Sequence, residues 1–219
     1  MTLATEQTLE ADMLEDQDMS VQEAAAIVQD ARARARKELV ISAPLVYTAW
    51  GLVWLLGYGA MWLSVRAQNP YTGPSGVSIA AVFVLAAFAV AAVLVIAHRA
   101  AAGIDGQSVR HRRIILATWA IGYLILLLVQ AAISSSVSTR TLAFAGFAGP
   151  LLLAGLTYIL ASALGRNRPA SALGAWLVIV GASCAWLAPA AILATCALAG
   201  GGAFLLIAVI ETRLRAHAR

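Results

Sequence analysis

Charged residues are scarce in this chain of 219 residues. Asp, Glu, Lys and Arg account for 12% of the sequence, whereas soluble globular domains contain about 25%. Hydrophobic residues make up 61%. This composition excludes an ordinary soluble domain and indicates a membrane protein.

Residues that could build a catalytic or metal site are also few. The two cysteines, Cys184 and Cys196, lie inside apolar runs without metal-ligand spacing, so we interpret them as small buried hydrophobes. His98 and His111 have no carboxylate or cysteine cluster beside them that would complete a metal site. No phosphate-binding loop, nucleophile elbow or zinc-protease motif is present. We therefore expect no enzyme and no cofactor.

Long apolar runs, in contrast, are abundant. A helix needs about 20 apolar residues to cross a hydrocarbon core of about 30 Å. Such runs predict six spans, at residues 43–65, 77–97, 114–134, 142–164, 171–188 and 190–210. Pro189 predicts a tight turn between the last two, because proline lacks a backbone donor. The expected fold is all-α, a polytopic six-helix transmembrane bundle at 43–212 with a short basic tail at 213–219.

Ionisable side chains are absent from the middle of every predicted span. Such residues usually mark proton relays and ion pathways in membrane proteins. Their absence disfavours a proton-coupled pump.

The distribution of basic residues predicts the orientation. Arg66 and Arg140 lie in the loops after spans one and three, and the other 13 of the 15 Lys and Arg residues lie in segments on the opposite side. Positively charged short segments stay on the cytoplasmic side. Both termini should therefore be cytoplasmic, in the cytoplasmic membrane of a bacterium.

Residues 1–42 are expected to form a cytoplasmic arm. Residues 1–18 are acidic and poor in aromatics, which predicts disorder. Ser20 and Glu23 fit a capping box, and the apolar residues that follow recur with helical period, so we predict an amphipathic helix at about 20–40.

Clusters of arginine flank the predicted membrane segments on the cytoplasmic side. They comprise Arg32, Arg34, Arg36 and Lys37 in the arm, and Arg110, Arg112 and Arg113 before span three. A basic residue near an anionic bilayer surface contributes about 1 kcal/mol of attraction. We assign these residues to topology and to anionic lipid headgroups, and the net charge of +4 does not indicate nucleic-acid binding.

Span one carries an aromatic ladder, Trp50, Trp54, Tyr58 and Trp62, at four-residue spacing. A four-residue step advances about 400° around a helix, so the rings form one slowly winding face. The ladder either packs and anchors the span, which we favour, or forms an aromatic wall around an apolar or cationic ligand. Gln130 in span three is the best candidate for an interhelical hydrogen bond, with substrate contact as the less favoured alternative.

Two places in the spans contain helix breakers. Pro150 lies in the fourth run, and Gly200, Gly201 and Gly202 are consecutive in the sixth. Such residues allow close packing, a kink or unwound backbone, and transporters place binding sites at such breaks. They are our hinge candidates.

The run WGLVWLLGYGAMWLSV at residues 50–65, preceded by the charged amphipathic helix, resembles a group of small multi-pass bacterial membrane proteins. These are uncharacterised proteins, particularly actinobacterial ones, described only as integral membrane or transport proteins. The resemblance covers about a quarter of the chain and implies no catalytic or binding residues.

Two functions remain open. One is a small permease-like transport component, favoured by six spans, compact external loops and the helix breaks. The alternative is a membrane-anchored regulatory or scaffold protein whose N-terminal helix docks a cytoplasmic partner. The expected partners are the lipid bilayer, including anionic lipids, and either a cytoplasmic protein or further copies of this chain.

Overall fold

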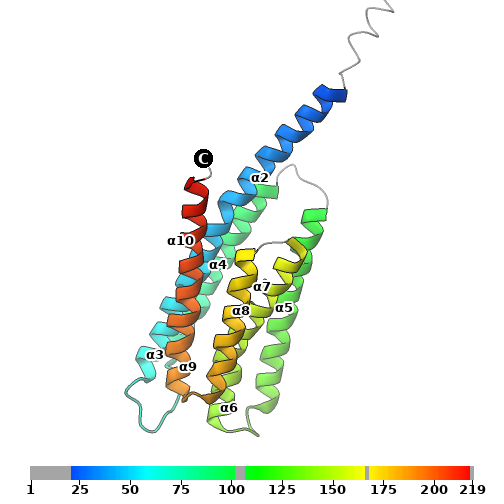
Figure 1. Ribbon diagram of the computed structural model, residues 1–219. Helices are drawn as coiled ribbons and strands as arrows, with labels where there is room; N and C mark the ends of the chain where they lie inside the picture. Colours follow the sequence, from blue (N-terminus) through cyan, green and yellow to red (C-terminus); the bar gives the residue numbers. More distant parts are fainter. Residues whose placement is uncertain (1–20, 102–106, 166–167, 218–219) are drawn as a thin grey trace, which may run out of the picture. The chain divides into compact units, whose positions relative to one another are not determined.

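The computed structural model describes residues 21–101, 107–165 and 168–217 (Figure 1). All regular structure in these ranges is helical. The elements are α2 Val21–Leu52, η1 Val53–Tyr58, α3 Gly59–Val65, α4 Gly76–Ala101, α5 Gln107–Ile133, α6 Thr139–Ala143, η2 Phe144–Ala148, α7 Gly149–Gly165, α8 Arg168–Ser183, η3 Cys184–Trp186, α9 Pro189–Thr195, η4 Cys196–Gly201 and α10 Gly202–His217.

Six helical segments are long and apolar enough to cross a membrane, which confirms the six-span all-α fold expected from the sequence. They are Ala43–Val65, Gly76–Ile96, Ile114–Ile133, Thr139–Leu164, Arg168–Trp186 and Pro189–Leu214. The fourth span begins three residues earlier than expected, because Ser138 caps its first turn by accepting from the Thr141 amide at 3.2 Å.

The chain divides into two compact units, Met1–Ile41 and Ser42–Arg219. In the first unit, residues 1–20 lie outside the described residues, and so does the disorder expected at 1–18. The helix that begins at Val21 does not end near residue 40, as the sequence suggested, but continues as α2 to Leu52 with Pro44 inside it. No glycine or proline interrupts residues 21–43, so helical hydrogen bonding can continue through the basic segment.

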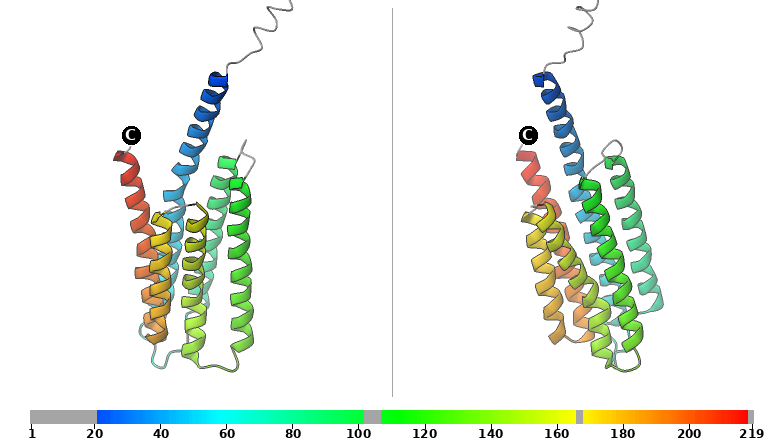
Figure 2. Two further views of the ribbon diagram at one scale, coloured as in Figure 1. Left: turned by 45° about the vertical axis from the view of Figure 1, so that its right-hand side comes forward. Right: turned by 90° about the vertical axis from the view of Figure 1, so that its right-hand side faces the viewer.

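The second unit is a bundle of helices that alternate in direction (Figures 1 and 2). One end, which we call the hairpin end, carries the connections at residues 66–75, 134–138 and 187–188. The opposite end, the terminal end, carries the end of α4, the start of α5 and the end of α10.

The core of the second unit is built from spans one, four, five and six. Its fully buried side chains include Leu151, Leu177, Ile192, Leu193 and Phe204. In each of these four spans, 39–44% of the most apolar 18-residue stretch is buried. In the second and third spans, formed by α4 and α5, the buried share is only 6% and 0%. α4 and α5 are therefore peripheral helices with most of their surface available to lipid.

Glycines set the tightest helix crossings. A Cβ on Gly155 of α7 would lie 2.8 Å from the Gly174 carbonyl oxygen of α8, and one on Gly174 would lie 2.7 Å from the Gly155 oxygen. Span one and span six cross in the same way, because a Cβ on Gly201 would lie 2.7 Å from the Leu55 backbone nitrogen. Lipid provides no hydrophobic drive for helix association, so close backbone approach and dispersion contacts hold these pairs together.

Three spans contain a widened π-helical turn, at η1, η2 and η4. η2 immediately precedes Gly149 and Pro150, and the wider turn accommodates a proline that cannot donate to the preceding turn. Gly200 and Gly201 lie in η4, and Gly202 begins α10. The expected helix breaks are therefore π turns rather than unwound backbone, and their role as hinges stays a prediction.

The turn expected at Pro189 is present. Leu187 and Ala188 are extended, and Pro189 occupies the first turn of α9, where its missing donor costs no hydrogen bond. Cys184, just before this turn, and Cys196, just after α9, are both fully buried. This agrees with their interpretation as small buried hydrophobes.

The loop at residues 66–75 is held by one amide side chain. Gln68 Oε1 accepts from the backbone nitrogens of Thr72 at 3.0 Å and Gly73 at 3.2 Å, and its Nε2 donates to the Gly73 oxygen at 3.0 Å. Gly73 has a φ of 105°, a backbone conformation that residues other than glycine rarely adopt. The loop is thus a compact, internally bonded turn.

Candidate functional site

The aromatic ladder of span one separates into a core half and a peripheral half. Trp54 and Tyr58 are buried in the core, and their rings stack with centroids 4.7 Å apart and an interplanar angle of 5°. Trp62 lies near the hairpin end, where the Arg66 guanidinium carbon is 5.8 Å from its ring centroid. These three rings have packing or anchoring surroundings, and none of them lines the pocket described below.

Trp50 has a different environment, because its ring reaches the third span. Its centroid lies 5.3 Å from that of Trp119 on α5, and Trp119 in turn stacks on Tyr123 at 5.6 Å. Both indoles are partly buried. Trp50 and Trp119 therefore connect two helices at the periphery of the bundle.

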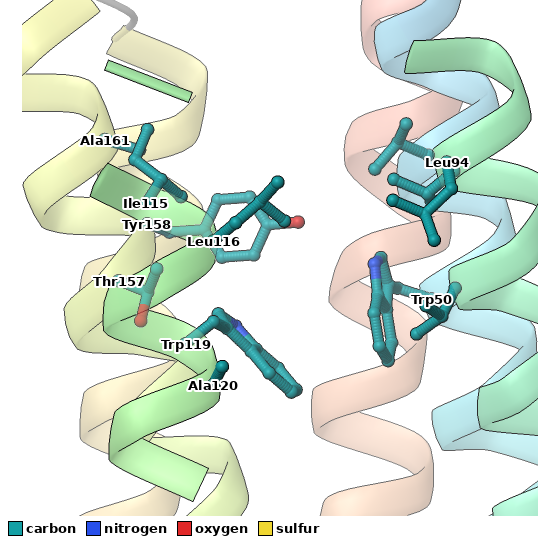
Figure 3. A pocket seen from close by; sticks show the side chains of 12 residues that line it. Trp50, Leu94, Ile115, Leu116, Trp119, Ala120, Thr157, Tyr158 and Ala161 are labelled. Atoms are coloured by element: carbon teal, nitrogen blue, oxygen red, sulfur yellow. The ribbon is translucent and has the colours of Figure 1, made fainter. Parts of the chain in front are cut away.

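Beside this pair is a cavity of about 340 Å³, which we call the lateral pocket (Figure 3). Its lining residues come from α2, α4, α5 and α7 and all lie within the second unit. Its lining residues are Val46, Trp50, Val90, Val93, Leu94, Ile115, Leu116, Trp119, Ala120, Thr157, Tyr158 and Ala161. Ligand pockets in proteins have volumes of about 300–1,000 Å³, so the lateral pocket can hold part of a small apolar molecule.

The mouth of the lateral pocket lies between α4 and α5. Val90 and Leu94 on α4 and Leu116 on α5 are 43–51% exposed. At the base, Thr157 is buried, and the Tyr158 ring packs into the core against Phe204, with centroids 5.5 Å apart. Figure 3 shows the two walls facing each other across open space. The pocket therefore opens sideways, on the surface that lipid covers.

Glycine contacts explain why these two helices stay apart. A Cβ on Gly57 would lie 3.0 Å from a methyl group of Val82, so α4 is seated on span one. α5 is seated on α7 instead, where a Cβ on Gly122 would lie 2.6 Å from a Leu153 methyl group. α4 packs against span one, and α5 packs against span four. The space between α4 and α5 is therefore filled only by side chains.

The chemistry of the lateral pocket is almost entirely apolar. None of its 12 lining residues is charged. Thr157 Oγ1 donates to the Leu153 oxygen of its own helix at 2.8 Å and so offers little to a ligand. The indole rings and the Tyr158 ring present π faces. The arrangement suits dispersion and aromatic contact with an apolar chain and contains no acid–base or nucleophile–base pair.

Gln130 lies outside the lateral pocket. Its Nε2 donates to the Ala145 oxygen of η2 at 3.1 Å, which confirms the interhelical hydrogen bond expected of it. Two other donors behave similarly, since the Cys196 thiol reaches the Phe147 oxygen of η2 at 3.5 Å and the Trp176 indole donates to the Ala199 oxygen of η4 at 3.0 Å. The carbonyls of π turns thus receive side-chain donors from neighbouring helices.

A second groove lies between α8 and α10. It is lined by Ala172, Leu173, Trp176, Leu198, Ala199, Ala203, Leu206, Ile207 and Ile210. The Trp176 indole nitrogen is already satisfied by Ala199, and Leu198 and Leu206 are exposed. This groove has only one aromatic ring and is more open, so the lateral pocket is the better candidate site.

The remaining predicted residues lie elsewhere. Arg32, Arg34, Arg36 and Lys37 belong to α2, and Arg110, Arg112 and Arg113 to the first two turns of α5. Their side chains are outside the described part, so their headgroup role stays a prediction. Within the described residues, no group of three His, Cys, Asp or Glu side chains could hold a metal ion.

Sequence reasoning missed three residues. Trp119 and Tyr158 line the lateral pocket, and neither is among the residues singled out from the sequence. Glu211 in α10 is 7% exposed and lies inside the sixth span, which extends to Leu214 rather than ending at residue 210. A signal was available for Glu211, because it is the only acidic residue after Asp105.

The six spans and the lipid-facing pocket define the class of the protein: it is a multi-pass membrane protein that contacts the lipid bilayer. Scans against protein-family models, curated proteins and solved structures find no match to the chain. Of the resemblance to small bacterial membrane proteins, the six-span architecture is what the structure supports.

Proposed function

We propose that the protein is a small permease-like transport component whose substrate is apolar or amphipathic and enters from the bilayer. The lateral pocket is the observation that carries this proposal. It has the size of a ligand site, an aromatic wall from Trp50 and Trp119, and a mouth on the lipid-facing surface.

The interior of the bundle favours a membrane-dissolved substrate over a water-soluble one. Its axis is filled by Trp54, Tyr58, Leu151 and Phe204, all buried. Among the described residues of the six spans, Glu211 is the only carboxylate, and it lies close to the end of its span. Polar solutes and ions need polar groups along their path, whereas an apolar chain needs only the surface that the lateral pocket offers.

We further propose that the membrane is the bacterial cytoplasmic membrane and that both chain termini are cytoplasmic. The asymmetry of 13 basic residues against two supports this orientation. The terminal end of the bundle, and with it the lateral pocket, then faces the cytoplasmic leaflet. The absence of reactive pairs among the pocket residues supports a role other than an enzyme.

A reconstituted flux assay tests the transport proposal. Proteoliposomes containing the full chain should move a fluorescent single-chain amphiphile between leaflets faster than protein-free liposomes. Ala120→Phe should abolish the gain, because a phenyl ring would fill the pocket from its α5 wall. Ala132→Phe, the same change on an exposed position of α5 outside the pocket, is the matched control. Unchanged flux in Ala120→Phe would contradict the proposal.

A second candidate function rests on the first unit. Ile27 and Val28, which are adjacent in the arm part of α2, are 59% and 45% exposed and so offer apolar surface to a partner. This favours the regulatory or scaffold alternative, in which the arm docks a cytoplasmic protein. Ile27→Asp combined with Val28→Asp should release a co-purifying partner from native membranes, whereas Gln29→Asp should retain it. Equal recovery with both variants would count against docking.

A further inference from the structure

The lateral pocket lies within a single leaflet of the bilayer. On α4, its residues Val90 to Leu94 lie two to six residues before the span ends at Ile96, and on α5, Ile115 to Ala120 lie one to six residues after Ile114. At about 1.5 Å of rise per residue, both walls extend to about 9 Å from the edge of the apolar region. Half of a hydrocarbon core is about 15 Å, so the pocket does not reach the other leaflet.

The edge of the bilayer next to the pocket is strongly basic. Arg110, Arg112 and Arg113 are in the first two turns of α5 and directly precede the wall residues Ile115 and Leu116. Arg99 is in the last turn of α4. The segment 97–113 contains one acidic residue, Asp105, against these four arginines. In the sequence, the ends of α4 and α5 that adjoin the lateral pocket are therefore rich in arginine.

We propose that the lateral pocket binds one acyl chain of an anionic phospholipid from this leaflet, with the phosphate headgroup at the arginine-rich start of α5. The proposal rests on the proposed function and names the class of its substrate. Charge complementarity selects the headgroup, because arginine binds phosphate oxygens through paired N–H donors. The rings of Trp50 and Trp119 and the aliphatic residues of α4 select the chain.

Photolabelling in proteoliposomes tests the proposal with the full chain. The probes are phosphatidylglycerol and phosphatidylcholine that carry the same diazirine-bearing acyl chain, and labelled peptides are located by mass spectrometry. Labelling of residues 90–94 and 115–120 is normalised to that of residues 124–129, a stretch of α5 outside the pocket in which every residue but Leu126 is exposed. Phosphatidylglycerol should label the pocket about fivefold more than phosphatidylcholine, as about 1 kcal/mol of headgroup attraction implies.

Charge variants test the headgroup. The triple variant Arg110→Gln, Arg112→Gln and Arg113→Gln should reduce phosphatidylglycerol labelling to the level of phosphatidylcholine. The matched triple variant Arg32→Gln, Arg34→Gln and Arg36→Gln removes the same charge from the arm and should leave the preference intact. Equal labelling by the two lipids in the wild type, or a preference that survives the α5 variant, would overturn the headgroup assignment.

Pocket-filling variants separate this inference from the proposed function. Ala120→Phe on α5, or Leu94→Trp on α4, should reduce labelling by both lipids. If both lipids label the pocket equally and Ala120→Phe lowers both, the pocket binds chains and only the anionic preference fails. If neither lipid labels the pocket above residues 124–129, the pocket binds no acyl chain, and the lateral-entry function fails with it.

Discussion

The crossing of α7 with α8 and the gap between α4 and α5 show two ways in which neighbouring helices can be arranged in one bundle. At the crossing, Gly155 and Gly174 let the two backbones touch. A Cβ on either glycine would clash with the carbonyl oxygen of the other. At the gap, neither helix presents a glycine to the other, and side chains of α4 and α5 remain exposed.

The difference shows what packing in lipid requires. Leucine and valine gain little by leaving lipid for a protein interface, so an apolar surface alone does not bring two helices together. α4 is the most apolar span, and yet only 6% of its most apolar 18-residue stretch is buried. Small residues, rather than hydrophobicity, determine which helices form the core and which border a pocket.

The largest expected difference in the free energy of unfolding is between substitutions of two tryptophans, one in the core and one at the gap. Trp54→Ala removes a buried ring from the core and should lower the free energy of unfolding by about 3–5 kcal/mol. Trp119→Ala removes a partly exposed ring at the gap and should cost about 1 kcal/mol, the value of an aromatic pair. Reversible unfolding in mixed micelles measures both. Similar losses would show that the gap is as well packed as the core.

A smaller effect is expected from two adjacent glycines at the crossing of spans one and six. Gly201→Ala places a Cβ 2.7 Å from the Leu55 backbone nitrogen and should destabilise by about 1–3 kcal/mol through overpacking. Gly202→Ala meets nothing within 4 Å and should be neutral or stabilise by up to about 1 kcal/mol. The same unfolding measurement compares the pair, and equal effects would contradict backbone contact at this crossing.

The smallest effect concerns the attachment of α5 to the core. Gln130→Leu removes the hydrogen bond to the Ala145 oxygen, and interhelical hydrogen bonds in membranes average about 0.6 kcal/mol. We expect a loss of that size in the free energy of unfolding, with the lateral pocket preserved in the photolabelling assay. A loss of pocket labelling would show that this bond, rather than the glycine contacts, positions α5.

Much of the fold follows from the sequence in physical terms. Apolar run lengths and hydrocarbon thickness predicted all six spans, and Pro189 predicted the turn between the last two. Gln130 was recognisable because an amide in a span needs a partner that lipid cannot supply. The ladder interpretation was correct for Trp54 and Tyr58, which are buried in the core, but Trp50 lines a cavity.

The lateral pocket was not predictable. Its walls come from four spans, and its lining residues are up to 115 positions apart in the chain, from Val46 to Ala161. None of these residues is charged or belongs to a sequence motif that indicates a binding site. Glu211 escaped notice because the apolar run ended one residue before it, whereas the helix continues to His217. A run of apolar residues marks where lipid contact is tolerated, not where a helix stops.

The sequence by itself determined that this chain enters a membrane, how often it can cross and which segments are basic, because these properties depend only on composition and segment length. The tertiary structure decided which helices touch and which leave space between them. That choice depends on where glycines on one helix meet side chains on another, and so does the division of one aromatic ladder between a packed core and a pocket open to lipid.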